Sequence, residues 1–539
     1  MTNFLYLPEQ LKQIFLSVNA LLPEVLLSTS FLFMIMIDLI LYHNQQNKGK
    51  MIKSITKSSQ IIFFFCLLSV VVILNQIAQQ FYISNDLFLF DRMLVLDLKA
   101  VVFKFLIVLS TILLLAHIYV TKKEFVAEFY PILISMVIGL CLMTMSVNLL
   151  MIYLSIEIVS VSSYILTTID KTRKSTESGL KYILFGASAS AVMLYGMSLL
   201  YGMTGTLDIT SPDFSRGISQ IDSVASTVAI VLTISGFLFK ISASPFHVWT
   251  PDVYESAPTP VVAFFSVAPK IAGFLVAIRF YAAVPNNLQT ITAVLAMASI
   301  TFGNFSALWQ NNAKRLLAYS TIAHSGFMLI GLVTMSQLGL TSVVFYLIVT
   351  LFTNLAAFLL VDFAEPAFVG VFSNKLPKPY SSLLEKTPAK AESDSSLLEK
   401  TPTKAKITNT QFLIPNFSGL GRLNPFYGIM MLIVMISLAG IPPTAGFFAK
   451  LNIFSALWET YQNTNQPILL WLFIFGLLNT AISLFFYLKI PFYLFFKEPL
   501  ENQSFELNSK QYFLAIILVL PILILFFKAD WLMDLISYL

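Results

Sequence analysis

Residues 236–270 read GFLFKISASPFHVWTPDVYESAPTPVVAFFSVAPK, and this stretch decides how the rest of the chain is understood. Its first part is apolar enough to lie in a membrane, yet it carries Lys240, and Pro245 then interrupts the hydrogen bonding of a helix. A second apolar run carries Lys270 directly after Pro269. Non-helical backbone at membrane depth is tolerated only inside protein or beside a wet cavity. Two intramembrane lysines beside helix breaks therefore predict an ion path rather than a simple span.

The composition is that of a membrane protein. Of the 539 residues, 57% are hydrophobic and 11% are charged, which excludes a soluble globular chain and a disordered one. At about 20 residues per crossing, the chain has room for about fourteen spans, all helical because lipid leaves no other open arrangement. We therefore predict an all-α membrane protein. The expected spans lie near residues 22–42, 60–79, 99–119, 126–146, 148–169, 178–202, 226–247, 259–280, 289–308, 317–335, 340–362, 427–449, 467–491 and 511–533.

Positive charge alternates between the expected loops. The loops after the first, third, fifth and ninth spans are basic, and the intervening loops carry few lysines or arginines. The basic loops should face the cytoplasm or matrix, with both termini on the other side. We see no cleavable signal in residues 1–20, and we favour a bacterial cytoplasmic (inner) membrane over a mitochondrial inner membrane. The basic residues are Lys48, Lys50, Lys53, Lys57, Lys122, Lys123, Lys171, Arg173, Lys174, Lys314 and Arg315.

A second break is expected inside the twelfth span. Residues 440–446 read GIPPTAG, so that Pro442 and Pro443 interrupt the helix, and Lys450 follows. An interrupted span in each half of a membrane protein points to two repeats, each with a broken helix near its ion site. The seventh and twelfth spans are five apart, which is an odd number, so the repeats should have opposite membrane orientations.

One long polar segment, 365–424, interrupts the spans. It contains SSLLEKTPAKA from Ser381 and SSLLEKTPTKA from Ser395, and both copies are rich in Lys, Glu, Ser and Pro. We interpret the repeat, which occupies residues 381–405, as a duplication in a flexible loop on the basic face. A docking element for a partner is the alternative.

A carboxylate, Glu157, lies deep in the apolar run LLMIYLSIEIVSVSSYIL. Such a group is costly in a membrane unless it is paired or protonated. We favour an ion partner that acts on a lysine over a static salt bridge between helices. Lys181 opens the sixth span, and its position alone fits extension to the membrane surface nearly as well as proton transfer.

Lys240 and Lys270 are deeper in their runs, where an ammonium is poorly solvated and proton exchange is favoured. Lys450, beside the second break, is a further candidate. His324, in LLAYSTIAHSGFMLIGL, is either a proton relay or a packing residue. Lys104 and Glu24 lie nearer span ends, where Lys104 should reach the surface and Glu24 should act as a cap.

Three polar residues follow the first break, namely His247, Asp252 and Glu255. They form either structural ties in a tight loop or the mouth of a proton-uptake path, and the sequence does not separate these interpretations. Cys66 and Cys141 lie in apolar runs and the four histidines do not cluster, so we expect no disulfide and no metal site. We also expect no flavin, nicotinamide or iron–sulfur site, because the chain has neither a Rossmann glycine pattern nor a cysteine cluster.

Several of these motifs together resemble the subunit N (subunit 2) family of the proton-pumping NADH–quinone oxidoreductase, respiratory complex I. The resemblance runs from the fourth span to the thirteenth, and the first three spans and the last match in hydropathy more than in motif. The segments that carry it are the opening stretch, IEIVSVSSYIL, ESGLKYILFGASASAVMLYGMSLLYGMTG, KRLLAYSTIAHSGFMLIG and LAGIPPTAGFFAK.

The resemblance implies an antiporter-like fold of fourteen helices with two inverted five-helix repeats and broken helices 7 and 12. It implies N-terminal helices in 1–120, a first repeat in 121–285, a second in 286–495 with the insertion at 365–424, and a last helix in 496–539. Lys450 fits subunit N or L better than subunit M, and the 381–405 repeat departs from the family. The implied proton-translocating residues are Glu157, Lys181, Lys240, Lys270, Lys450 and, between the two halves, His324.

The implied function is that of a translocase subunit, which couples electron transfer from NADH to quinone in partner subunits to proton movement across the membrane. This chain would hold no cofactor, and NADH, flavin, iron–sulfur clusters and quinone would bind to the partners. The expected partners are other membrane-arm subunits and the lipid bilayer, with no nucleic acid. A subunit of a multisubunit sodium/proton antiporter is the first alternative. A structural membrane scaffold with static ion pairs is the second.

Overall fold

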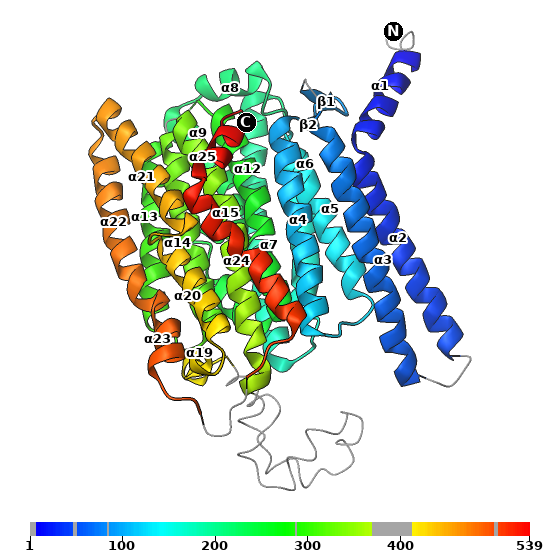
Figure 1. Ribbon diagram of the computed structural model, residues 1–539. Helices are drawn as coiled ribbons and strands as arrows, with labels where there is room; N and C mark the ends of the chain where they lie inside the picture. The colour runs from blue at the N-terminus through cyan, green and yellow to red at the C-terminus, as the bar shows by residue number, and fades with distance from the viewer. Residues whose placement is uncertain are drawn as a thin grey trace.

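The structure is a computed structural model that describes residues 7–46, 51–82, 86–285, 288–368, 412–500 and 505–538. In these ranges the chain forms a bundle of helices with one small β-hairpin (Figure 1). Twelve helices of the described residues are long and apolar enough to cross a membrane, and two shorter apolar helices, Phe129–Met145 and Pro425–Ala439, accompany them. The prediction of an all-α membrane protein with about fourteen transmembrane helices is confirmed.

The N-terminal part contains a helix and a hairpin that the sequence analysis did not anticipate, α1 and β1–β2. The two strands pair antiparallel, with Leu87 opposite Leu96. The Asp97 side chain then caps the next helix by accepting a hydrogen bond from the Ala100 N–H at 2.8 Å. The elements are α1 (Leu7–Ala20), α2 (Leu22–Gln46), α3 (Met51–Gln80), β1 (Leu87–Leu89), β2 (Leu94–Leu96) and α4 (Leu98–Thr121).

The first half of the bundle contains the predicted break. Helix α9 ends at Lys240, earlier than expected, and the Ser244–Pro245 peptide is cis. The backbone of the break is satisfied inside the protein, since the Ser244 N–H donates to the Ser299 hydroxyl at 2.8 Å. Pro269 stands in the first turn of α12, where its missing N–H is tolerated. The elements are α5 (Phe129–Met145), α6 (Leu149–Thr167), α7 (Arg173–Thr204), α8 (Pro212–Ser219), α9 (Ser223–Lys240), α10 (Trp249–Ser256), α11 (Thr259–Phe265) and α12 (Ala268–Ala283).

The second half contains the other break. Helix α20 ends at Ala439, Gly440 takes a left-handed conformation, and the Pro442–Pro443 peptide is cis. The expected end of this span at residue 449 is wrong, because α21 continues to Thr464. The elements are α13 (Gln289–Leu308), α14 (Ala313–Thr334), α15 (Gln337–Phe363), η2 (Ile414–Phe417), α19 (Leu420–Leu423), α20 (Pro425–Ala439), α21 (Ala445–Thr464), α22 (Pro467–Tyr487) and α23 (Lys489–Phe496).

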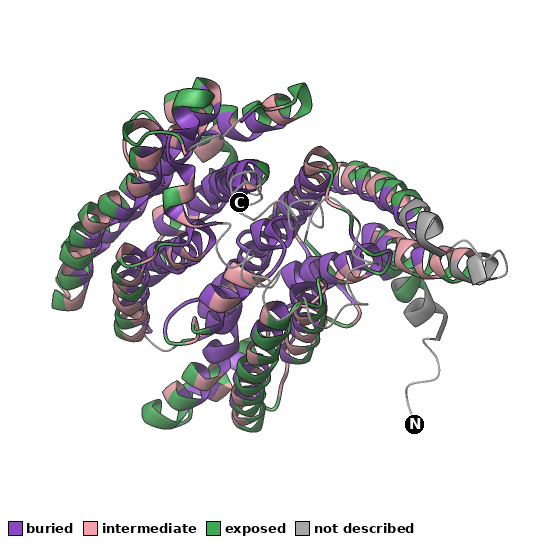
Figure 2. Ribbon diagram, turned by 90° about the horizontal axis from the view of Figure 1, so that it is seen from below, coloured by how far each residue is buried: buried purple, intermediate pink, exposed green. Residues whose placement is uncertain are grey.

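The C-terminal part crosses in front of the second half in Figure 1 and packs on α15. The expected span 511–533 is divided, since α24 (Ser509–Phe527) ends before α25 (Ala529–Ser537) begins. Helices α12, α14 and α15 are buried along most of their length, whereas α7, α22 and α24 each leave a side exposed (Figure 2). The exposed apolar sides are the surfaces that lipid or neighbouring subunits cover.

Contacts between loops show which expected loops share an end of the bundle. On the less basic side, which is the upper end in Figure 1, Arg92 lies 3.7 Å from Asp208. On the basic side, Lys123 reaches Glu365 at 2.9 Å, at the end of α15. The duplicated segment at 381–405 lies outside the described residues.

Candidate functional site

One face of α14 joins the two halves of the protein. Lys270 on α12 donates hydrogen bonds to the carbonyl oxygen of Thr321 and, at 2.6 Å, to the hydroxyl of Ser325. Ser325 donates in turn to the carbonyl oxygen of Ile241, the residue directly after Lys240. A set of hydrogen bonds therefore runs from the first break, through α14, to the lysine beside Pro269.

Lys240 is buried, with 3% of its surface exposed. Its Nζ atom has no hydrogen-bond partner and no carboxylate within 4.0 Å among the described residues. Glu157 is close enough to interact with it electrostatically, and its own carboxylate accepts a hydrogen bond from the Ser190 hydroxyl. The structure thus brings the two predicted partners near each other without forming a static ion pair.

His324 lies in the centre of the site and is hydrogen-bonded on both ring nitrogens. Its Nδ1 atom is 2.7 Å from the Tyr346 hydroxyl on α15, and its Nε2 atom is 3.0 Å from the Tyr487 hydroxyl on α22. Tyr487 continues the chain to the Ser320 hydroxyl at 2.5 Å. His324 also interacts electrostatically with Lys270 and with Lys450. This arrangement can exchange a proton at either nitrogen.

Lys450, in the second turn of α21, is buried and donates a hydrogen bond to the Ala439 carbonyl oxygen at 2.7 Å. Its ammonium lies 4.8 Å from the centre of the Phe327 ring on α14, within the range of a cation–π contact. Gly440 permits this approach, because its φ is +81° and a Cβ atom there would lie 2.6 Å from Cδ of Lys450. The backbone of the second break therefore packs closely against the Lys450 side chain.

The predicted residues Lys181, Asp252 and Glu255 do not join this line, and instead form an ion-pair network at the basic face. Asp252 is 3.1 Å from Lys181 and 2.9 Å from Arg315, and Glu255 is 2.9 Å from the same arginine. Lys174 adds a contact to Glu255 at 2.7 Å. Lys181 is half-exposed and also lies 3.1 Å from Glu177.

The charge state of these two carboxyls follows from their neighbours. Burial acts to raise the pKa of Asp252, but the hydrogen bonds and charges of Lys181 and Arg315 outweigh it and hold that pKa below its ordinary value. The pKa of Glu255 is also lowered, since Lys174 and Arg315 outweigh the same effect of burial. Both groups are ionised at neutral pH, which favours the role of ties that fasten α10 to α7 and α14.

His247 lies apart from this network. It is partly buried, its ring stacks on Phe302 of α13 with the centroids 5.9 Å apart, and its Nδ1 atom has no hydrogen-bond partner among the described residues. The three residues that follow the first break thus occupy two different environments.

Some buried groups were missed or misjudged from the sequence. The expectation that Lys104 reaches the membrane surface is wrong, because its side chain is fully buried and its Nζ lies 2.8 Å from Glu24. Glu24 is accordingly an interhelical ion-pair partner rather than a cap at the interface. Lys314 is also buried, and donates to the Ala257 carbonyl oxygen at 2.6 Å. Position near a span end was the misleading signal for Lys104.

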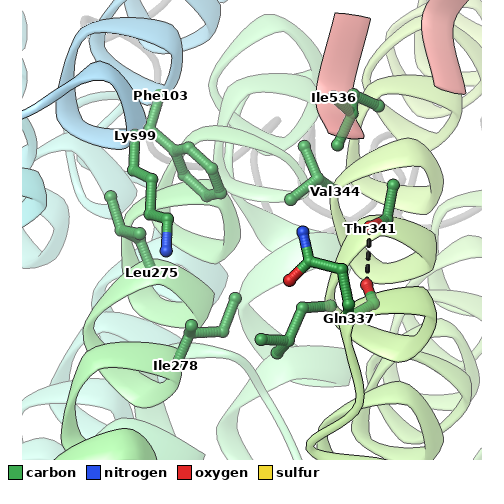
Figure 3. Close-up of a pocket in the computed structure, with 9 residues that line it drawn as sticks. Lys99, Phe103, Leu275, Ile278, Gln337, Thr341, Val344 and Ile536 are labelled. Carbon is green, nitrogen blue, oxygen red and sulfur yellow. Dashed lines mark hydrogen bonds between the residues drawn. The ribbon is translucent and has the colours of Figure 1, made fainter. Parts of the chain in front are cut away.

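No group of three or more His, Cys, Asp and Glu side chains that could hold a metal ion occurs in the described part of the chain. Cys66 and Cys141 are both free and buried. A small pocket lies between α4, α12, α15 and α25 (Figure 3). Its lining is mostly apolar, with Lys99, Gln337 and Thr341 as polar members, and includes none of the predicted site residues.

Comparisons with known proteins place these features in context. The family described as "NADH:quinone oxidoreductase/Mrp antiporter, TM" matches residues 146–390 and 403–483. The chain is 35% identical over 530 residues to NADH-quinone oxidoreductase subunit N of Chlorobium chlorochromatii (strain CaD3), covering 94% of this chain and 91% of that one. It is 34% identical over 505 residues to NAD(P)H-quinone oxidoreductase subunit 2 of Nostoc sp. (strain PCC 7120), covering 92% and 85%.

Two solved structures share the fold. A chain of respiratory complex I from Thermus thermophilus is 24% identical, with a TM-score of 0.72 over 95% of this chain and 98% of that one. A chain of the Mrp complex from Dietzia sp. is 18% identical, with a TM-score of 0.73 over 96% of both chains. At these identities the likeness concerns the arrangement of helices alone.

Proposed function

This chain belongs to the NADH:quinone oxidoreductase/Mrp antiporter family of membrane subunits, and on that premise we propose that its buried lysines carry out proton translocation for an NADH–quinone oxidoreductase. It is an antiporter-like subunit N of such a complex, multi-pass in the bacterial inner membrane. Its partners are other membrane-arm subunits.

The observation that carries the proposal is the line of buried basic groups with neutral partners. Lys270 is held by a carbonyl and a hydroxyl, and Lys450 is held by a carbonyl and an aromatic ring. A neutral carbonyl accepts a hydrogen bond from an ammonium and, more weakly, from the amine that remains after proton loss. Each of these two lysines can therefore change its protonation state and keep its hydrogen-bond partner.

The sequence of groups supports a relay across the membrane interior. Glu157 acts electrostatically on Lys240, Ser325 links the first break to Lys270, and His324 interacts with Lys270 and Lys450. In this proposal the chain moves protons and holds no redox centre. NADH, flavin, iron–sulfur clusters and quinone would bind to partner subunits, whose redox reaction would drive changes of protonation here.

A sodium/proton antiporter subunit is the second candidate, because the Mrp complex shares this fold. The two functions separate in one experiment. The chain is tagged in its native membrane, the complex is isolated, and inverted vesicles are assayed for NADH-driven proton uptake with and without sodium. Co-purification with NADH-oxidising subunits and sodium-independent uptake are expected. Isolation without such subunits, together with proton movement that requires a sodium gradient, would contradict the proposed function.

A further inference from the structure

A groove opens at the basic side of the membrane between α3, α4 and α5, towards the lower end of these helices in Figure 1. It is lined by residues of α3, the last turn of α4, the loop 122–126 and Tyr130 of α5, and its volume is about 620 Å³. That volume falls within the range of about 300–1,000 Å³ that is usual for ligand sites. One candidate membrane span begins at Ser58 and another ends at Thr121, so the groove lies at the depth of lipid headgroups.

The walls of the groove are fixed by contacts within the protein. The Phe63 ring lies 6.3 Å from the Tyr119 ring and 5.7 Å from the Tyr130 ring, measured between centroids. The Ser59 hydroxyl donates a hydrogen bond to the Phe125 carbonyl oxygen at 2.6 Å, which holds the loop 122–126 against α3. The groove is therefore formed before any ligand enters it.

An apolar stripe leads from the groove towards the interior of the membrane. Phe64 lines the groove and is 57% exposed. Leu68, Val71 and Val72 are also exposed, and their spacing places them on the same face of α3 as Phe64. From Phe64 to Val72 this face extends about 12 Å along the helix. A long hydrocarbon chain that starts in the groove can follow it.

The rim of the groove carries positive charge that the protein does not neutralise. Lys122 is exposed and forms no ion pair with a carboxylate of the described residues. Lys510, at the start of α24, donates a hydrogen bond to the Tyr119 hydroxyl at 2.8 Å, and it likewise has no carboxylate partner in the described ranges. Lys123 is already paired with two carboxylates, and Glu124 is the acidic residue of the lining. Two unpaired ammonium groups against one carboxylate favour an anion.

We propose that this groove binds one anionic phospholipid from the leaflet on the basic side of the membrane. The lipid phosphate contacts the ammonium groups of Lys122 and Lys510, and one acyl chain lies on Phe64 and continues along α3. Basic sites between transmembrane helices on this side of a membrane recognise acidic headgroups, and lysine side chains are long enough to reach them. The inference adds a lipid site to the chain and does not depend on the proposed function.

A photoreactive lipid tests the site in the assembled complex. The complex is placed in phosphatidylcholine nanodiscs with rising fractions of phosphatidylglycerol that carries a diazirine in one acyl chain. Mass spectrometry then measures labelling of residues 59–72 and 119–130. The double variant Lys122→Gln, Lys510→Gln should raise the fraction needed for half-maximal labelling about tenfold or more, because it removes both cations. A phosphatidylcholine probe with the same diazirine should label these residues more weakly in the wild type.

Lys528→Gln is the matched control. Lys528 is an exposed lysine at the other end of α24, and its ammonium also lies on an aromatic ring, 5.4 Å from the ring centre of Trp531. This variant should label like the wild type. Equal labelling of the wild type and the double variant would overturn the inference, and so would equal labelling by the two probes.

A second measurement needs no variant. A cryo-electron microscopy map of the wild-type complex, at a resolution where bound lipids are visible, should show a headgroup beside Lys122 and an acyl chain on Phe64. A map in which a neighbouring subunit fills the groove would overturn the inference. A map that shows lipids elsewhere and none here would do the same.

Discussion

The lysines beside the two broken helices differ in position and in hydrogen bonding. Lys240 is the last residue of α9 and precedes its break, whereas Lys450 lies in the second turn of α21 and follows its break. The first break spans residues 241–248 and leaves its lysine without a hydrogen-bond partner among the described residues. The second spans residues 440–444 and gives its lysine the Ala439 carbonyl. The lysines beside the two breaks thus differ, since one has no hydrogen-bond partner among the described residues and the other donates to a backbone carbonyl.

After the two breaks the chain continues towards opposite faces of the membrane. After the first break, α10 continues to the basic face, where its carboxylates meet Arg315. Helix α20 begins near that same face, so α21 continues towards the opposite one (Figure 1). In this account the first lysine is open to exchange with the basic side, and the second exchanges its proton while it stays hydrogen-bonded to the Ala439 carbonyl.

Among the changes that compare the two breaks, the largest effect is expected at Glu157, because only the first break has a described carboxylate that interacts with its lysine. Glu157→Gln should assemble but pump at about a tenth of the wild-type rate or less, as expected when a group required for proton transfer loses its charge. Glu157→Asp should be milder. Ser190→Ala is the matched control, since it removes a hydrogen bond to the carboxylate and keeps the charge. Equal pumping by the glutamine variant and wild type would refute the asymmetry.

The next effect concerns the glycine beside each lysine. Gly440→Ala places a Cβ atom 2.6 Å from Cδ of Lys450 and forces a left-handed conformation that costs about 1–2 kcal/mol. Gly273→Ala places one 2.7 Å from Cγ2 of Ile241, in a helix of ordinary conformation. Pumping should therefore fall more at the second break than at the first. A larger loss of pumping in Gly273→Ala than in Gly440→Ala would show that the second break is not packed more tightly than the first.

A smaller effect is expected when the ion pairs that hold α10 are removed. Asp252→Asn and Glu255→Gln should each lower stability by about 1 kcal/mol or less, because these ion pairs are partly exposed. Both carboxyls have a lowered pKa in the folded protein. Their contribution to the free energy of unfolding is therefore complete above about pH 4.5, and it is lost as the pH falls through the folded-state pKa values. Thermal unfolding of the complex at several pH values measures this. Loss of pumping at unchanged stability would make them proton carriers rather than ties.

The smallest effect is expected from the duplicated segment, which belongs to the second half only. Deletion of Ser395 to Ala405 should leave proton pumping unchanged, because the Lys, Glu, Ser and Pro composition offers little apolar surface to bury. Pumping is measured after assembly has been checked on a native gel. Loss of pumping by an assembled complex would contradict this expectation. Loss of assembly would favour the alternative that the segment docks a partner.

The sequence predicted the breaks well because proline and glycine act locally. It located Lys240, Lys270 and Lys450 beside them, and the structure places all three in buried positions. It did not predict their partners, since the carbonyls of Thr321 and Ala439 are backbone atoms that any residue could supply. Only the packing of α12 and α21 determines which carbonyl each ammonium meets.

Other differences have equally definite causes. The twelfth span was expected to end at 449, whereas the residues after Lys450 continue as helix α21 to Thr464. Lys104 was expected at the surface because hydropathy cannot show that α3, α5 and α12 pack against α4, or that Glu24 of α2 reaches the Lys104 ammonium. Lys181 lies where its sequence position allowed, near the basic loops, but three-dimensional packing supplies Asp252 as its partner.

The most direct test of the relay is Lys270→Arg. Arginine keeps the positive charge and can donate to the Thr321 carbonyl and the Ser325 hydroxyl, but it does not release its proton in proteins. The measurement is NADH-driven proton uptake by vesicles that contain the assembled complex. The account predicts an intact complex with uptake near zero. Near-normal uptake would show that Lys270 need not exchange a proton, and would contradict the relay at the position where the two halves meet.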